Sequence, residues 1–209
     1  QARNVEVADP LPAILDFKKQ LDAIGVELLL VPVPAKSLVY PDRLADDFSL
    51  PLPFPRLDTA HQEFYALLRD NEIDVIDLME PFLDDRYHPD GPLYCRQDTH
   101  WSGVGCVLAG RAIAQTLTSR PWLANLATTT YSAGWESISI DGDLVPDTSP
   151  ATIREELQLR RIVRPYPLPP TEVPTDPASP IVLLGDSHNL VFHAGGDMHT
   201  TGAGLADQL

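Results

Sequence analysis

Basic residues, cysteines and long apolar runs are all scarce in this 209-residue sequence. It contains 15 Lys and Arg against 30 Asp and Glu, which gives a formal net charge of −15. A negative field of that size repels phosphate backbones and anionic lipid surfaces, so nucleic acid is not an expected partner. An anionic polysaccharide would need a local basic patch to overcome the same repulsion.

No apolar run approaches the roughly 20 residues that a membrane-spanning helix requires. The most apolar stretch, residues 28–33, has the length of a strand and ends in prolines. The sequence is therefore not expected to cross a membrane itself. Gln1 is not a natural start and no signal peptide is visible, so we expect a removed signal or an N-terminal membrane anchor before it, and an exported, periplasmic protein.

The two cysteines, Cys95 and Cys106, have no zinc-ligand spacing and no obvious ligands beside them. A disulfide would suit an exported protein, and a pair of free, partly buried thiols would suit the same positions. The sequence leaves both alternatives open.

Helix and strand patterns alternate along the chain. Apolar residues recur at helical spacing over residues 10–24, with Gly25 as the stop, and again over 57–69, where Phe64, Leu67 and Leu68 are expected to face inward. Ser102 can cap a third helix over 103–118. Apolar runs at 26–33, 73–78 and 181–184 are typical of buried strands, so we expect them in one largely parallel sheet of an α/β fold.

Residues 119–180 lack this regularity, and their second half is rich in proline. They are interpreted as an irregular connection within a single domain that covers residues 1–209. The chain ends soon after the last expected strand, where an α/β domain usually supplies further strands, so we expect this domain to continue beyond residue 209.

A Gly-Asp-Ser turn at residues 185–187 follows the last of these apolar runs. Ligand sites of parallel α/β sheets form at the carboxyl ends of strands, and backbone N–H groups at a helix start suit an oxyanion. Ser187 is thus a candidate nucleophile, with its backbone N–H as a candidate oxyanion donor. A serine needs a base, and His100 is the best candidate because Asp98, two residues away, can orient its ring.

Each motif has an ordinary structural explanation. Gly-Asp-Ser is a common turn, and Asp-Thr-His-Trp before a helix could be a capped loop packed by Trp101. The two motifs together, each beside an expected strand or helix end, are much more specific. A rival hypothesis places a metal on His188, His193, Asp197 and His199, but their spacing matches no helix-based motif. We predict no metal and no cofactor.

The order of the motifs carries a resemblance to a known family. "GDS" after a strand resembles the nucleophile block of SGNH hydrolases, and Asp-x-His-Trp before it is similar to the alginate O-acetyltransferase (AlgX/AlgJ) family, which has these blocks in permuted order. "LLLVPVPAKSLVYPDRL" and "DGDL" at 141–144 agree further. The resemblance implies an SGNH-hydrolase-like three-layer α/β/α sandwich. It makes Ser187 the nucleophile, His100 the base and Asp98 its partner. Trp101 and His188, each next to one of these residues in the sequence, are the predicted substrate contacts.

The function that this resemblance implies is polysaccharide O-acetylation through an acyl-serine. The expected partners are a polysaccharide acceptor and an acetyl donor, supplied through a membrane acyl-transfer protein. A carbohydrate esterase of the same fold differs only in that water attacks the acyl-enzyme. A non-catalytic carbohydrate-binding domain is the third alternative, and the intact Asp98, His100 and Ser187 set argues against it.

Overall fold

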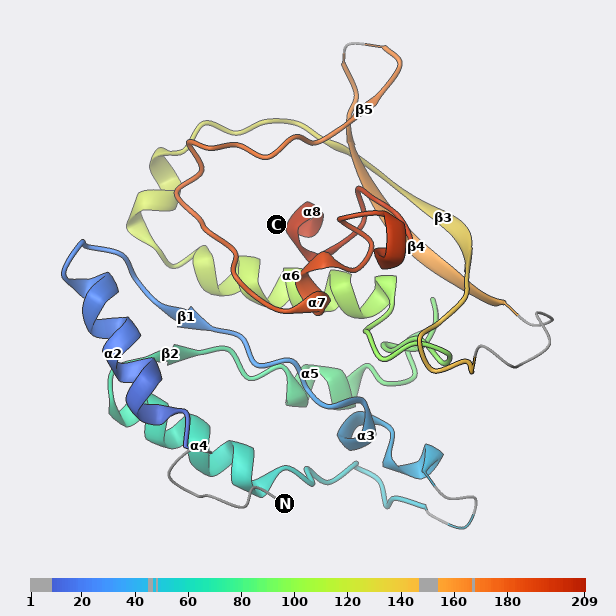
Figure 1. The fold of residues 1–209 in the computed structure, drawn as a ribbon, viewed down its shortest axis with the longest axis horizontal. Coiled ribbons are helices and arrows are strands. Elements are labelled where there is room, and N and C mark those ends of the chain that lie inside the picture. The colour runs from blue at the N-terminus through green and yellow to red at the C-terminus, as the bar shows by residue number, and fades with distance from the viewer. Residues whose placement is uncertain (1–8, 45–46, 48, 147–153, 167) are drawn as a thin grey trace. The chain divides into compact units, whose positions relative to one another are not determined.

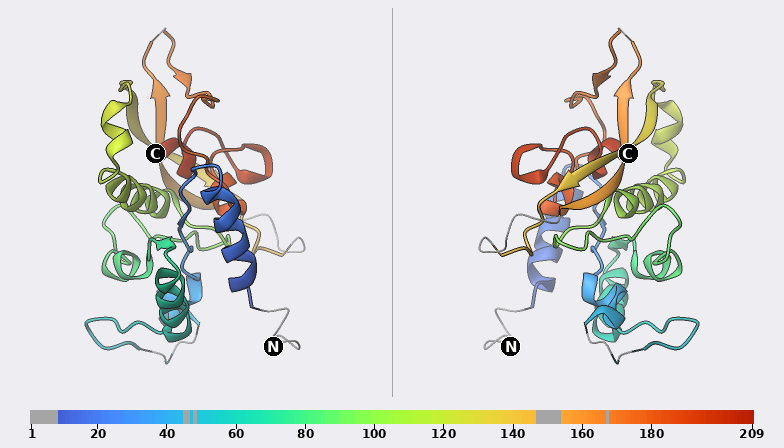
Figure 2. Two further views of the ribbon diagram at one scale, coloured as in Figure 1. Left: turned by 90° about the vertical axis from the view of Figure 1, so that its left-hand side faces the viewer. Right: turned by 90° about the vertical axis from the view of Figure 1, so that its right-hand side faces the viewer.

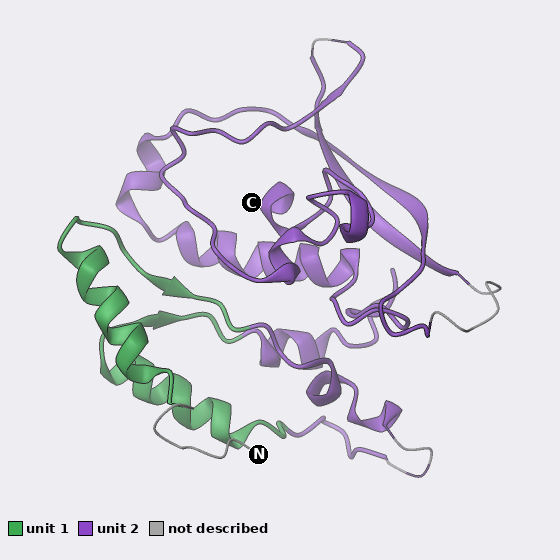
Figure 3. Cartoon of the chain, viewed as in Figure 1, with its two compact units in different colours: residues 1–32, 56–77 green, residues 33–55, 78–209 purple. Residues whose placement is uncertain are grey.

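The computed structural model describes residues 9–44, 47, 49–146, 154–166 and 168–209 (Figure 1). The chain divides into two compact units, one of residues 1–32 and 56–77 and the other of residues 33–55 and 78–209 (Figure 3). Helices alternate with strands as far as β2, and a run of three consecutive strands follows later in the chain. Within the described ranges, no helix is both long and apolar enough to span a bilayer.

In the described residues of the smaller unit, two helices precede two short parallel strands. Helix α2 (Leu11–Asp22) leads to β1 (Leu29–Leu30), and α4 (Thr59–Asp70) leads to β2 (Asp74–Val75). Leu29 pairs with Asp74 and Leu30 with Val75. Both helices and both strands were predicted from the sequence, although the strands are much shorter than their apolar runs.

The core of the smaller unit forms around Tyr65, Leu68 and Ile73. Phe64 packs against this core as expected. Leu67, however, is 42% exposed, so its predicted inward orientation is wrong, and Tyr65 occupies the buried position instead. Gly25 has a φ of +73°, which explains why a glycine follows α2.

The larger unit contains the remaining elements. Its helices are α3 (Lys36–Val39), η1 (Pro41–Arg43), α5 (Met79–Asp84), α6 (Gly103–Leu117), η2 (Pro121–Asn125), α7 (Ser187–Leu190), η3 (Gly196–Met198) and α8 (Leu205–Gln208). Its strands are β3 (Ser132–Ile140), β4 (Glu155–Arg164) and β5 (Thr171–Glu172), which form an antiparallel sheet in the order β3-β4-β5.

Helix α6 is the central helix of this unit and lies against β4 and α8 (Figure 2). The Ser102 hydroxyl accepts hydrogen bonds from the N–H groups of Val104 and Gly105, at 3.2 and 3.3 Å, which is the predicted cap. A Cβ at Gly103 would lie 2.4 Å from the Gln158 carbonyl oxygen of β4. The small residue is therefore what allows the start of α6 to approach the strand so closely.

The long β3–β4 ladder lies within the stretch that the sequence presented as irregular. It runs from the Ser132–Val163 pair to the Ile140–Glu155 pair. The interpretation of 119–180 as an irregular connection is therefore wrong for these two strands. In β4, buried and exposed residues alternate at first, so no continuous apolar run marks the strand. The single domain over 1–209 stays a prediction.

Residues 181–184 are a second correction, because they form no strand. Val182 and Leu184 are 80% and 75% exposed. An apolar run becomes a strand only when a neighbouring backbone completes its hydrogen bonds, and within the described residues none does. The prediction that this segment shares one sheet with β1 and β2 is wrong, and among the residues that the structure describes only β1 and β2 pair in parallel.

The two cysteines are free and buried, which decides between the two alternatives that the sequence left open. The Cys95 thiol donates to the Trp101 carbonyl oxygen at 3.5 Å. Burial raises the pKa of both thiols, so neither is a reactive nucleophile in the folded chain.

Candidate active site

The Asp-Thr-His motif lies in a tight loop that ends at the start of α6. Tyr94 and Trp101 form an antiparallel bridge across the loop, and the Cys95 N–H donates to the His100 carbonyl oxygen at 3.1 Å. The loop then passes directly into Ser102, the cap of α6. The backbone on either side of His100 is therefore held by hydrogen bonds.

Three distant side chains hold the loop. The buried carboxylate of Glu155 accepts the backbone N–H groups of Arg96 and Gln97 at 2.7–2.8 Å. The ammonium group of Lys36 donates to the Asp98 carbonyl oxygen at 2.9 Å. The carboxylate of Asp143 accepts from the Thr99 N–H at 2.7 Å and from the Thr99 hydroxyl at 2.5 Å.

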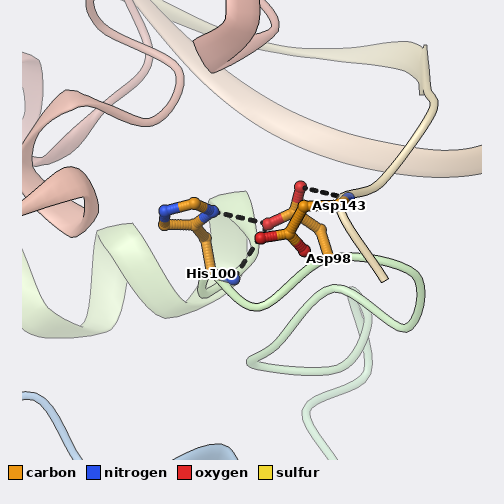
Figure 4. A group of neighbouring side chains, drawn as sticks. All are labelled: Asp98, His100 and Asp143. Carbon is orange, nitrogen blue, oxygen red and sulfur yellow. Dashed lines mark hydrogen bonds and ion pairs between the residues drawn. The ribbon is translucent and has the colours of Figure 1, made fainter. Parts of the chain in front are cut away.

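Asp98 lies at the centre of these contacts and binds His100 directly (Figure 4). Its Oδ1 accepts the His100 backbone N–H at 2.9 Å and is 2.5 Å from His100 Nδ1. Its Oδ2 is 3.0 Å from His199 Nε2 and accepts the Asp143 backbone N–H at 3.3 Å. Both side chains of the Asp98–His100 pair are almost fully buried.

The charge state of Asp98 follows from these bonds. Burial by itself would raise the pKa of Asp98, but the hydrogen bonds from His199 and from the backbone and ring of His100 outweigh it and hold the pKa well below its usual range. Asp98 is thus a carboxylate, and an ionised carboxylate can only accept. The His100 Nδ1 must then carry a proton when the ring is neutral, which leaves Nε2 as a proton acceptor. Figure 4 shows this second nitrogen turned away from Asp98.

The Gly-Asp-Ser turn meets this pair through the residue after the serine. Ser187 is the first residue of α7, and Asp186 caps the helix by accepting the His188 N–H at 2.9 Å. The His188 ring is 5.0 Å from the His100 ring and 5.3 Å from the Trp101 ring, measured between centroids. The structure thus brings the two motifs together. Within the described part of the chain, no hydrogen bond joins Ser187 to His100.

His188 and Trp101, the predicted substrate contacts, occupy different environments. Trp101 is 1% exposed and packs beneath His188, so here its ring supports the site rather than forming its surface. His188 is half-buried. Burial, with a smaller contribution from the charge of His100, lowers the pKa of His188, although Asp186 opposes the shift. A ring kept neutral beside His100 does not compete with it for positive charge. Both substrate contacts stay predictions.

The rival metal hypothesis finds no support in the positions of its histidines. His188 pairs with Asp186, His193 with Asp207 and His199 with Asp98, so each ring has a different carboxylate. Among the residues described, one group does offer three ligand atoms within 4.8 Å of one another: Asp98, His100 and Asp143. The hydrogen bonds of Asp98 to the His100 ring and to the Asp143 N–H account for that proximity.

Sequence reasoning missed four residues that support the site. Asp143 belongs to the "DGDL" segment and Lys36 to the long strand-and-loop segment, so both lie in stretches that carried the resemblance. His199 was considered only as a metal ligand. Glu155 had no signal, since nothing in a sequence identifies which acidic residue will accept the N–H groups of a loop almost 60 positions away.

Comparison with known proteins identifies the family. A family model described as SGNH hydrolase-like domain, acetyltransferase AlgX, matches residues 1–195. The chain belongs to this family. The resemblance seen in the motifs is thereby confirmed, and so is the SGNH-hydrolase-like α/β fold class.

The chain is also similar to proteins named probable alginate O-acetylase AlgJ. The one from Pseudomonas putida is 31% identical over 115 residues, which are 55% of this chain and 28% of the relative. The one from Pseudomonas aeruginosa is 29% identical over 100 residues, which are 48% of this chain and 24% of the relative. The matched stretches span about a quarter of the length of these relatives.

Two solved structures share the fold. The O-acetyltransferase domain of Pseudomonas putida AlgJ superposes with a TM-score of 0.56 at 28% identity, over 71% of this chain and 53% of that domain. Pseudomonas aeruginosa AlgX superposes with a TM-score of 0.51 at 17% identity, over 71% of this chain and 36% of that one, and supports the fold alone.

Proposed function

We propose that this chain is part of a polysaccharide O-acetyltransferase that works through an acetyl-serine on Ser187. The observation that carries the proposal is the buried Asp98–His100 pair, whose ring packs against the residue that follows Ser187. Membership of the acetyltransferase family supports the reaction class. The names of the AlgJ relatives point to a polysaccharide such as alginate as the acceptor.

In the first half of the reaction, the Ser187 hydroxyl attacks the carbonyl carbon of an acetyl ester donor. His100 Nε2 takes the hydroxyl proton as the new C–O bond forms. The bond to the donor oxygen then breaks, and this oxygen leaves with the proton from Nε2. The product is an acetyl ester on Ser187.

In the second half, a sugar hydroxyl gives its proton to His100 Nε2 and attacks the acetyl-serine. The bond to Ser187 Oγ breaks, and this oxygen takes the proton back from the ring. Throughout, Asp98 holds the ring orientation and stabilises its charged form. The backbone N–H of Ser187 is the proposed donor to the oxyanion of each tetrahedral intermediate.

The setting of this reaction belongs to the same proposal. We place the protein in the periplasm and infer that a membrane acyl-transfer protein supplies the acetyl donor. An esterase would use the same residues with water as the acceptor. The geometry of Asp98 and His100 suits either reaction, and the experiment below separates them.

The test is incubation of the whole protein with an activated acetyl ester, with and without candidate oligosaccharides. Ser187→Ala removes the nucleophile, and Ser119→Ala is the matched control, since Ser119 is an exposed serine beyond the end of α6. Acetylated oligosaccharide that forms in the wild type and in Ser119→Ala, but not in Ser187→Ala, supports the transferase.

Other results select the alternatives. Ester cleavage that depends on Ser187 but is indifferent to sugar would identify an esterase. Saccharide binding without ester turnover would identify a binding domain. Equal turnover in the wild type and Ser187→Ala would contradict both enzymes.

A further inference from the structure

The carboxylate of Asp98 binds a second histidine that the proposed mechanism does not use. His199 Nε2 lies 3.0 Å from Asp98 Oδ2, the oxygen that does not face the His100 ring. Both side chains are largely buried, at 13% and 3% exposure. The two residues are 101 positions apart, and His199 lies beyond the residues 1–195 that match the family model.

The backbone at His199 has an unusual conformation. Its φ and ψ are +71° and −56°, and the Thr200 N–H donates to the Met198 carbonyl oxygen at 2.9 Å. Together these describe a γ-turn of the rare, strained type with His199 at its centre. A strained residue persists only where its surroundings hold it in place.

The surroundings of His199 supply that restraint. The Phe192 N–H donates to the Met198 carbonyl oxygen at 2.9 Å, and the Gly195 N–H donates to the Thr200 carbonyl oxygen at 3.0 Å. The Phe192 ring also lies 5.8 Å from the His199 ring. The two neighbours of His199, Met198 and Thr200, are thus hydrogen-bonded to the segment of residues 192–195.

Strand β4 also holds the loop that carries His199. The Arg161 guanidinium donates to the Thr201 carbonyl oxygen at 2.6 Å and to the Thr200 hydroxyl at 3.0 Å. Glu136 on β3 holds this guanidinium at 2.7 Å. The Ile162 N–H donates to the Gly202 carbonyl oxygen at 2.9 Å. The residues that directly follow His199 are therefore anchored to the long hairpin.

We propose that His199 is a positioning residue of the active site, whose ring N–H fixes Asp98 Oδ2 and thereby the plane of the carboxylate that orients His100. The terminal torsion of an aspartate is soft, so donors to Oδ1 alone, here the ring and the backbone N–H of His100, leave the carboxylate some freedom to rotate. A second donor on Oδ2 removes that freedom. The backbone N–H of Asp143, at 3.3 Å, assists on the same oxygen. The inference rests on the proposed function, because it assigns His199 to the same reaction.

The experiment compares His199→Gln, which keeps an N–H donor at a similar reach, with His199→Ala, which has none. His193→Ala is the matched control, since it breaks a histidine–aspartate pair with Asp207 in the same C-terminal segment and does not touch Asp98. Two quantities are measured for each folded variant of the whole protein. One is kcat and KM for acetyl transfer, and the other is the pKa of Asp98 from carboxyl NMR.

We expect His199→Ala to lower kcat by roughly tenfold to a hundredfold with little change in KM, as for one lost hydrogen bond to a charged group. It should also raise the pKa of Asp98, because the carboxylate loses a donor. His199→Gln should recover most of both effects, and His193→Ala should leave the pKa of Asp98 unchanged.

Two outcomes would overturn the inference in distinguishable ways. If His199→Ala is folded and keeps the wild-type kcat while Ser187→Ala is inactive, the serine mechanism stands and His199 has no positioning role. If Ser187→Ala is fully active, the proposed function fails and the assignment of His199 fails with it.

Discussion

Asp98 carries a negative charge and also orients the His100 ring. The substitution Asp98→Asn removes the charge but keeps the shape of the side chain. In Asp98→Asn, one of the two histidines must face an amide N–H instead of a carboxylate oxygen. When that histidine is His100, its ring takes the wrong tautomer and Nε2 no longer accepts a proton. We expect the fold to persist and kcat to fall by about 10⁴, measured with the same acetyl ester. Near-normal turnover would remove Asp98 from the mechanism.

The stability of that variant provides an independent check with a defined sign. The folded pKa of Asp98 is lowered, so its charge stabilises the fold at pH values above the unfolded value of about 3.9. This contribution is lost as the pH falls through the folded pKa. In urea unfolding, Asp98→Asn should therefore be less stable than the wild type near pH 7, and the difference should shrink at pH values below about 4.

At the scale of single residues, the sequence identified the pair but not its support. Asp98 and His100 are two positions apart, so their contact is local and their pattern is visible in seven letters. Lys36, Asp143, Glu155 and His199 reach the loop from distant segments. Such contacts depend on how the hairpin and the C-terminal loop fold back, and local patterns do not encode that.

At the scale of elements, Gly142 matters because it allows the segment after β3 to contact the loop that carries Asp98. A Cβ at Gly142 would lie 1.9 Å from the Gln97 carbonyl oxygen and 2.7 Å from the Asp98 nitrogen. Gly142→Ala must therefore separate the two backbones and disturb the bonds of Asp143 to Thr99 and Asp98. We expect a loss of about 1–3 kcal/mol of unfolding free energy in urea, together with lower kcat.

Gly134 is the control for that substitution. It lies in β3, and a Cβ there would meet nothing within 4 Å. Gly134→Ala should therefore keep wild-type stability to within about 0.5 kcal/mol. Equal behaviour of the two alanine variants would show that the close approach at Gly142 does not matter to the site.

The helices α2, α4 and α6 were predictable because each has a local signature, whereas the short helices α3, α5 and α8 were not predicted. Periodic apolar residues gave α2 and α4 to within a few residues, and the Ser102 cap gave the start of α6. Strands depend on partners elsewhere in the chain. The β3–β4 ladder was missed because neither strand is a continuous buried run: β3 is exposed over most of its length, and buried and exposed residues alternate in the first half of β4. Residues 181–184 have an apolar run typical of a strand but pair with no strand in the described part of the chain.

At the scale of the whole molecule, the net charge of −15 makes a prediction about the acceptor. An acidic oligosaccharide is repelled from such a surface at low salt, whereas a neutral one is not. Raising the ionic strength from about 10 to 200 mM shortens the Debye length to less than 10 Å and screens the repulsion. We expect kcat/KM to rise with salt for a uronate oligomer and to stay nearly constant for a neutral one. A fall with salt for the uronate would instead indicate a local basic patch at the site.

The two buried thiols have a practical consequence. Cys95 lies in the loop that carries Asp98, and Cys106 lies in the first turns of α6, so both report on the same structural neighbourhood. Alkylating reagents attack thiolates, and the folded chain presents none at neutral pH. Each molecule that opens gains up to two adducts, and mass spectrometry can count them. The number of adducts therefore measures how often the loop that carries Asp98 and His100 opens.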